Sequence, residues 1–274
     1  MADINAALIK KLREYTGAGI MECKKILIEV NGDIDLAIEN IRKSSSIKAL
    51  KKINNVAVNG VIRAKILGNY GIILELNCET DFVTKNSDFL NFADKLIDAV
   101  SINPKIDIIQ LNKQFAEERS ELIAKIGENI LIKRINILKG NELGLYLHRD
   151  RIGVLVSGLN INKTLIKNIA MHIAASQPIF ITPEDIPSNI LEKEYKIQME
   201  IAKKSNSSKN FTEKIVEGRM KKFVNEISLT GQMFIMDLNK TVGHILKESK
   251  AEIINFIRFE LGEKIGILKK NKSC

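Results

Sequence analysis

Residues 69–83 read NYGIILELNCETDFV, and the order of elements in the centre of the chain follows from them. A turn signal, GNYG at 68–71, overlaps the start, and residues 72–78 then alternate between apolar and polar side chains. Residues 62–66 alternate in the same way before the turn. Because side chains on a strand point alternately to opposite faces, the two segments predict a β-hairpin.

The string TDFV at 80–83 lies where the second hairpin strand gives way to a helix, which the apolar spacing of residues 89–100 predicts. Taken alone, the string has a structural interpretation. Asp81 would cap the turn, and Phe82 would pack the following helix against the sheet. The residues by themselves favour this structural role.

Residues 1–54 predict three short helices, since apolar residues recur at helical spacing in three segments. The sequence TGAG at 16–19 separates the first two helices, and Asn31-Gly32 separates the second from the third, which Asp33 can cap. Polar residues then predict a solvated connector, made of Ser44, Ser45, Ser46, Lys48, Lys51 and Lys52.

Helical and strand patterns mix along the rest of the chain, which is typical of an α+β protein. Beyond the hairpin and its helix, further helices are predicted over 115–126, 165–174 and 241–247, and strands over 130–138, 143–148, 152–156 and 253–260. Residues 188–227 differ, because they read as two polar-rich helices joined by SNSS at 205–208. We expect them to form an inserted helical hairpin.

These patterns divide the chain into five expected parts. The parts are an N-terminal three-helix module at 1–54, a core N-terminal subdomain at 55–140, a core C-terminal subdomain at 141–187 and 228–263, a helical-hairpin arm at 188–227, and a short basic tail at 264–274. The order of elements is similar in the two core subdomains, without residue-level repetition.

Composition places the chain among folded proteins, with 45% hydrophobic and 27% charged residues. The 42 Lys and Arg exceed the 33 Asp and Glu and give a net charge of +9, which suits nucleic acid, an anionic membrane or an acidic protein as partner. No apolar run reaches the roughly 18 residues of a membrane span, and the N-terminal residues lack a signal-peptide pattern. We therefore expect a cytoplasmic protein.

Motifs for chemistry are missing from the sequence. It has no phosphate-binding P-loop and no nucleophile elbow, and its three cysteines have no zinc-site spacing. His148, His172 and His244 are far apart, so neither a metal nor a cofactor is expected. His172 reads as a helix residue at the edge of the core, His148 as a strand end, and Cys23 and Cys78 as buried, inert thiols. We expect no enzyme.

The ordered set of short motifs resembles the elongation factor Ts family, over about residues 1–263. The residues that carry the resemblance are TGAG at 16–19 with CKK at 23–25, NGDI at 31–34, AIEN at 37–40, NYGIILE at 69–75, TDFV at 80–83, KIGEN at 125–129, RIGV at 151–154, MHIA at 171–174, EGRMKKF at 217–223, SLTGQ at 228–232 and FIRFE at 256–260.

The resemblance implies an architecture and a function. The architecture is a ubiquitin-associated-like three-helix module, a two-part α+β core with antiparallel sheets, and an inserted coiled-coil arm. The function is guanine nucleotide exchange on elongation factor Tu: the protein binds the GDP complex, promotes GDP release and so permits GTP loading. By this resemblance, the segment that displaces magnesium from the partner corresponds to Thr80, Asp81, Phe82 and Val83. Phe82 would be the wedge, the side chain that inserts into the partner.

Further partner contacts are implied for Thr16, Gly17, Gly19 and Cys23 in the N-terminal module and for His148 in the second half of the core. The partner is elongation factor Tu, GDP-bound or nucleotide-free, and no direct binding of nucleotide, nucleic acid or membrane is expected. Self-association as a homodimer or in a two-by-two complex stays open. Two alternatives also remain, an RNA-associated translation protein, suggested by the positive charge, and an enzyme with an unfamiliar site.

Overall fold

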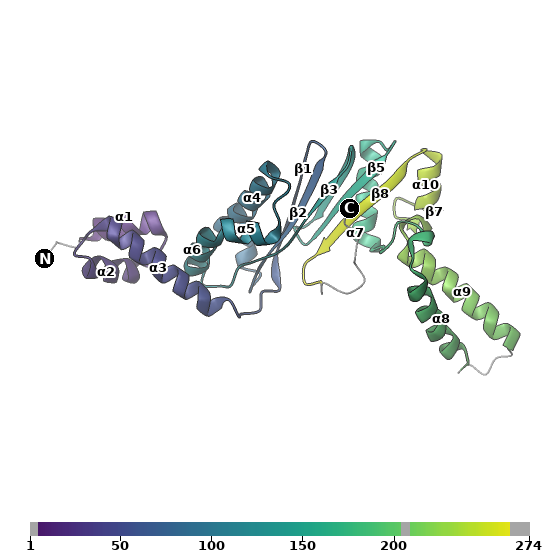
Figure 1. Cartoon of the computed structure of the whole chain (residues 1–274), viewed down its shortest axis with the longest axis horizontal. Helices are drawn as coiled ribbons and strands as arrows, with labels where there is room; N and C mark the ends of the chain where they lie inside the picture. The colour runs from purple at the N-terminus through teal and green to yellow at the C-terminus, as the bar shows by residue number, and fades with distance from the viewer. Residues whose placement is uncertain (1–4, 204–208, 264–274) are drawn as a thin grey trace. The chain divides into compact units, whose positions relative to one another are not determined.

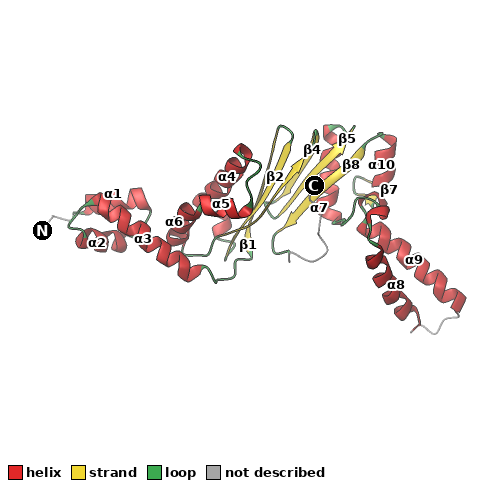
Figure 2. Cartoon of the chain, viewed as in Figure 1, coloured by secondary structure: helices red, strands yellow, loops and turns green. Residues whose placement is uncertain are grey.

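A computed structural model describes residues 5–203 and 209–263 of the chain (Figure 1). Helices and β-strands are both abundant and mixed along the chain (Figure 2), which confirms the α+β class. The chain divides into two compact units. The first is Met1–Arg63 with Leu74–Ile135, and the second is Ala64–Ile73 with Asn136–Cys274.

The first unit begins with three helices, α1 (Ala6–Thr16), α2 (Ile20–Glu29) and α3 (Ile34–Lys52). Their apolar faces enclose a small core of their own, made of Leu12, Cys23, Ile26, Leu27, Val30, Ala37 and Ile41. Asp33 caps α3 as predicted, since its carboxylate accepts a hydrogen bond of 3.1 Å from the Leu36 amide. Gly17 ends α1 in the left-handed conformation, with φ of 67°, and its amide bonds the Arg13 carbonyl at 2.7 Å.

The predicted connector after the third helix is wrong, because α3 continues through the three serines and the lysines to Lys52. The serine hydroxyls donate back into their own helix. Ser44 and Ser45 each bond the Ile41 carbonyl at 2.9 Å, and Ser45 is buried. These local bonds leave the hydroxyls satisfied inside a helix, so a polar run does not break it.

A three-stranded sheet follows, with the order β1 (Asn59–Leu67), β2 (Tyr70–Cys78) and β3 (Leu131–Lys139). Strands β1 and β2 form the predicted hairpin. Three helices accompany them in sequence, α4 (Ser87–Ile102), α5 (Ile108–Gln114) and α6 (Ala116–Ile126), of which α5 was missed because it is a short helix. The central strand β2 is buried on both faces from Gly71 to Cys78, which makes it the rigid support of the segment that follows.

The second unit contains an antiparallel sheet with the order β4 (Glu142–His148), β5 (Ile152–Leu159) and β8 (Glu252–Glu260). The register pairs His148 with Ile152 and Ile152 with Glu260. Helix α7 (Lys163–Ser176) packs on this sheet and supplies much of the core, together with α10 (Val242–Glu248). A small hairpin of β6 (Met233–Phe234) and β7 (Asp237–Thr241), which the sequence did not predict, precedes α10.

Two long helices, α8 (Ser188–Lys203) and α9 (Lys209–Ile227), lie side by side in the second unit (Figure 1). They correspond to the predicted helical hairpin, although its predicted joint at 205–208 lies outside the described residues, as does the basic tail at 264–274. Among the helices that the structure describes, none combines the length and the apolar character that a membrane span needs.

Candidate functional site

The segment that follows β2 is a short loop leading through a 3₁₀ turn, Val83–Lys85, into α4. Thr80, Asp81 and Phe82 are exposed, and the Phe82 side chain is 83% exposed. Val83 is the side chain that the loop buries. The interpretation in which Phe82 packs the helix against the sheet is therefore wrong, since a ring so exposed contributes little to the core.

The downstream side of Phe82 is fixed by local hydrogen bonds. The Phe82 carbonyl accepts from the Lys85 amide at 3.2 Å, and the Val83 carbonyl accepts from the Asn86 amide at 2.9 Å. The Asn86 side chain then caps α4 by accepting from the amides of Asp88 and Phe89. The Thr84 hydroxyl closes the turn on the Asp81 carbonyl at 2.6 Å.

The upstream side of Phe82 is held by a carboxylate from a distant part of the sequence. Glu128 accepts three hydrogen bonds, from the Glu79 amide at 3.1 Å, the Thr80 amide at 2.9 Å and the Thr80 hydroxyl at 2.6 Å. Glu128 stands between the left-handed Gly127, which ends α6, and the start of β3. The end of β2 and the start of β3 thus meet at this carboxylate.

The contact is reciprocal, because Glu79 holds the segment that carries Glu128. The Glu79 carboxylate accepts from the Asn129 amide at 2.6 Å and from the Asn55 side chain at 2.9 Å. The bond from the Asn129 amide lowers the pKa of Glu79 below its ordinary value, so the group is charged at neutral pH. The Asn59 side chain also donates to the Glu79 carbonyl at 2.8 Å.

Cys78 adds a further contact to the loop. Its thiol is fully buried and donates to the Thr80 carbonyl at 3.1 Å. Burial, together with the charges of Glu128, Asp81 and Glu79, raises the pKa of this thiol to about 12. The thiolate form is absent at neutral pH, so Cys78 acts as a donor in the structure and is unreactive, as the sequence predicted.

The sequence predicts Thr80 to Val83 as site residues, but it does not predict Glu79, Glu128 and Asn129, which hold them in place. A signal was present. A carboxylate and an amide, Glu128 and Asn129, come directly before one strand, and Glu79 comes directly after another. These polar residues meet only because β2 and β3 pair with each other. The pairing of strands that are distant in the sequence cannot be read from the sequence, so the contact could not be predicted.

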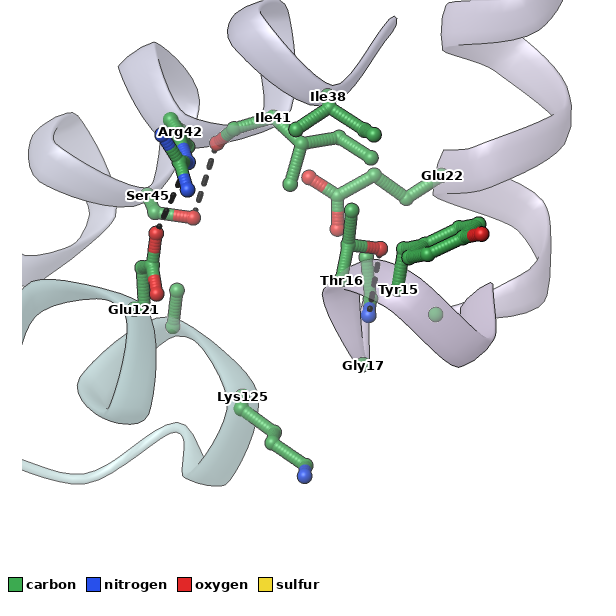
Figure 3. Close-up of a pocket in the computed structure, with 13 residues that line it drawn as sticks. Tyr15, Thr16, Gly17, Glu22, Ile38, Ile41, Arg42, Ser45, Glu121 and Lys125 are labelled. Atoms are coloured by element: carbon green, nitrogen blue, oxygen red, sulfur yellow. Dashed lines mark hydrogen bonds and ion pairs between the residues drawn. The ribbon is translucent and has the colours of Figure 1, made fainter. Parts of the chain in front are cut away.

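The structure gathers the TGAG residues of the N-terminal module around a small cavity of about 120 Å³ (Figure 3). Thr16, Gly17 and Gly19 line it, whereas Cys23 lies fully buried in the module's core, with its thiol 3.7 Å from the Ala18 carbonyl. Burial raises the pKa of the Cys23 thiol, which is therefore unreactive like that of Cys78.

Helix α6 supplies the other wall of this cavity (Figure 3). Arg42 of α3 lies 3.3 Å from the Glu121 carboxylate and 3.7 Å from that of Glu117. A Cβ atom added to Gly17 would lie 3.0 Å from the Lys125 Cε atom. Tyr15 of α1 also lines the cavity and its side chain is mostly exposed, as is that of Met21, two residues after the TGAG string in α2.

His148, the predicted contact of the second core half, is exposed at the end of β4. Its Nδ1 atom lies 3.1 Å from the Tyr146 hydroxyl. The three-residue turn after it, residues 149–151, holds Arg149 and Asp150 at positive φ, at 49° and 55°, and the Arg151 amide donates to the His148 carbonyl at 3.0 Å. His148 belongs to the second unit and the other predicted site residues to the first.

Within residues 5–203 and 209–263, no group of three or more His, Cys, Asp or Glu side chains is arranged to hold a metal ion. The prominent feature of the first unit is instead an exposed aromatic side chain on a loop fixed at both ends. Such an arrangement suits contact with another macromolecule, because a rigid exposed aromatic buries a large area on binding at little entropic cost. The structure is that of an α+β protein of two compact units, with an exposed aromatic side chain on a hydrogen-bonded loop.

Comparison with known proteins identifies the family of this chain. The sequence model described as "Elongation factor TS" matches residues 79–263. Proteins named "Elongation factor Ts" from Serratia proteamaculans (strain 568), Cronobacter sakazakii (strain ATCC BAA-894) and Escherichia coli O139:H28 are each 58% identical over 265 residues, which is 97% of this chain and 94% of theirs. The chain belongs to the elongation factor Ts family, and its role lies in translation elongation.

Proposed function

We propose that this protein is a guanine nucleotide exchange factor for elongation factor Tu. It binds the GDP complex of that partner, promotes GDP release and so lets GTP bind. The observation that carries the proposal is the Phe82 side chain, 83% exposed on a loop whose two flanks are fixed by hydrogen bonds. The names of the relatives support it.

The proposed local step is steric and electrostatic. Phe82 enters between packed elements of the partner's G domain, and the exposed Asp81 competes for donors near the bound magnesium ion. Magnesium is displaced, the phosphates of GDP lose their neutralising cation, and GDP dissociates. The chain makes and breaks no covalent bond in this scheme, so it is not an enzyme.

The remaining parts of the chain supply binding area. We propose that the three-helix module at 1–54 resembles a ubiquitin-associated domain and grips a helix of the same G domain through the surface near Thr16, Gly17 and Gly19, with Cys23 beneath it. We also propose that the second core half, including His148, contacts a further domain of the partner, and that the arm at 188–227 is a coiled coil. We propose that the protein acts in the cytoplasm, because translation elongation takes place there.

The deciding experiment adds the protein to elongation factor Tu loaded with a fluorescent GDP and follows the loss of fluorescence. We expect release to accelerate with increasing protein and to saturate. The same protein incubated with GDP alone should retain none. Unchanged release from the partner, or a stoichiometric GDP bound to this chain, would contradict the proposed function.

The Phe82→Ala variant tests the wedge within that assay. We expect complex formation to persist, because distant contacts remain, and the maximal release rate to fall at least about tenfold, since burial of one Phe contributes about 1.5–3 kcal/mol. Ile102→Ala is the matched control, because Ile102 is also an almost fully exposed apolar side chain of the first unit. Equal maximal rates for Phe82→Ala and the parent protein would show that the wedge is wrong.

A further inference from the structure

We propose that Glu128 is a positioning residue for exchange: its carboxylate holds the Glu79–Thr80 turn in the conformation that presents Phe82 to the partner. The proposal rests on the proposed exchange function and adds to it a residue that does not itself touch the nucleotide site. The geometry that carries it is the set of three hydrogen bonds that converge on the Glu128 carboxylate from Glu79 and Thr80.

The chemistry of the three donors explains why a carboxylate is needed at this position. Two consecutive amides and one hydroxyl all point at the same group, and successive amides form a small concave site that suits an anion. An ionised carboxylate has only acceptors, so it accepts all three without conflict. The short distance of 2.6 Å from the Thr80 hydroxyl is typical of a charge-assisted bond.

Asn129, the neighbour of Glu128, joins the same turn to other parts of the first unit, since its amide donates to the Glu79 carboxylate at 2.6 Å. Asn129 is buried, and its side chain donates to the carbonyls of Ile53 and Asn55 at 3.2 Å and 2.9 Å. Residues 53–55 follow the last helix of the N-terminal module. One hydrogen-bonded junction therefore connects the end of the module, the start of β3 and the loop at residues 79–82. Within this junction, Glu128 accepts the hydrogen bonds from Thr80.

Only Asp81 separates this junction from Phe82. Val83 is buried on the other side, so the position of the Phe82 backbone follows from Thr80 upstream and Val83 downstream. If Glu128 is lost, two amides and a hydroxyl must find water, and the upstream end of the loop samples other conformations. Each added conformation lowers the population in which Phe82 is presented, and the apparent activity falls with it.

The experiment compares Glu128→Ala and Glu128→Gln with the parent, and uses Glu118→Ala as the matched control. Glu118 lies on α6 and pairs with Lys95 at the surface, away from the loop. Three quantities are measured: the maximal rate of GDP release from elongation factor Tu at saturating protein, the protein concentration at half-maximal rate, and hydrogen exchange at the Glu79 and Thr80 amides by NMR. Thermal unfolding of each variant is recorded alongside.

For Glu128→Ala we expect the maximal release rate to fall about tenfold or more, because small errors of placement cost large factors in rate. Hydrogen exchange at the Glu79 and Thr80 amides should become at least about tenfold faster, because local opening of the hydrogen-bonded turn controls its rate. The Gln variant has the same shape but only one acceptor oxygen. Its maximal release rate and its hydrogen-exchange rates should therefore lie between those of the parent and of Glu128→Ala. Glu118→Ala should match the parent in all measurements.

The outcomes separate this proposal from the exchange function itself. If the parent accelerates release and Glu128→Ala does so equally well, the positioning role is wrong. It is also wrong if Glu128→Gln equals the parent, or if release falls only in proportion to a lowered unfolding temperature while the two amides stay protected. If the parent itself does not accelerate release, the exchange function fails, and the two amides still show whether Glu128 orders the loop.

Discussion

His172 is a titratable side chain whose protonation state the surrounding structure determines. The sequence placed it at the edge of the core, whereas the ring is fully buried, which corrects that prediction. Its Nδ1 atom accepts from the Ile235 amide at 3.3 Å, so Nε2 carries the proton and donates to the Gln232 side chain at 2.8 Å. Gln232 in turn donates to the carbonyls of Ser176 and Glu226, which joins α7 to the end of α9.

Stability should therefore depend on pH through this residue. Burial lowers the pKa of His172 below its ordinary 6.5, with the Gln232 bond opposing the shift in part. The unfolded chain takes up the proton at higher pH than the folded chain. The contribution of His172 to the unfolding free energy is therefore complete above about pH 6.5, and it is lost as the pH falls through the lower pKa of the folded state. Within that window each pH unit costs up to about 1.4 kcal/mol of unfolding free energy.

Urea unfolding between pH 8 and pH 5 measures this dependence. His172→Gln should be less stable than the parent at pH 8, yet its unfolding free energy should lack the decrease just below pH 6.5. His148→Gln is the control, since His148 is exposed and should leave the decrease in place. A parent protein as stable at pH 5.5 as at pH 8 would refute the prediction.

At the scale of elements, the packing of β1 on β2 depends on one missing side chain. A Cβ atom added to Gly60 would overlap the Leu76 carbonyl oxygen and lie 2.8 Å from the Asn77 Cα atom. Both neighbours are backbone, so neither can rotate away. The residue before it, Asn59, also donates to the Glu79 carbonyl, which makes the spacing of the two strands part of the support of the loop.

Gly60→Ala should therefore lower the unfolding free energy by about 1–3 kcal/mol, as overpacking does, and also lower the maximal rate of GDP release. Gly218→Ala is the control. Gly218 lies inside α9 with nothing near its added Cβ, so alanine there should raise helix stability by about 0.5–1 kcal/mol. Circular-dichroism melts and the release assay check both variants. A Gly60→Ala protein that is as stable and as active as the parent would show that β1 and β2 can accommodate the added methyl group, and the prediction would be wrong.

Elements with strong local signals could be predicted from the sequence, and those that depend on distant contacts could not. The hairpin and the Asp33 cap follow from alternation and capping chemistry over a few residues. The continuation of α3 through three serines could not be predicted, because it depends on hydroxyls that turn back onto carbonyls. The candidate loop was located, but its support by Glu128 joins positions 48 residues apart.

For the whole molecule, the proposed exchange reaction is a matter of coupled binding. A factor that binds the nucleotide-free partner more tightly than the GDP complex must weaken GDP by the same ratio. A shift of about 10⁴ needs roughly 5.5 kcal/mol of differential binding, whereas burial of one Phe contributes about 1.5–3 kcal/mol. The remainder must come from a broad interface, about 1,600 Å² for a stable complex, which a chain of several modules can supply.

The N-terminal module should therefore change affinity and leave the local step at Phe82 intact. Tyr15, which lines the TGAG cavity, and Met21, two residues after the TGAG string, are 68% and 75% exposed, so replacing both with alanine removes little packing inside the protein. We expect the concentration at half-maximal GDP release to rise about tenfold or more, as loss of exposed apolar anchors does at interfaces, with the maximal rate and the unfolding temperature unchanged. Ile109→Ala, at an equally exposed apolar position on α5, should behave like the parent protein. If the double variant reaches half-maximal release at the parent's concentration, the module does not grip the partner through this surface. If the maximal rate falls instead, the module acts on the nucleotide site, and the division between grip and wedge is wrong.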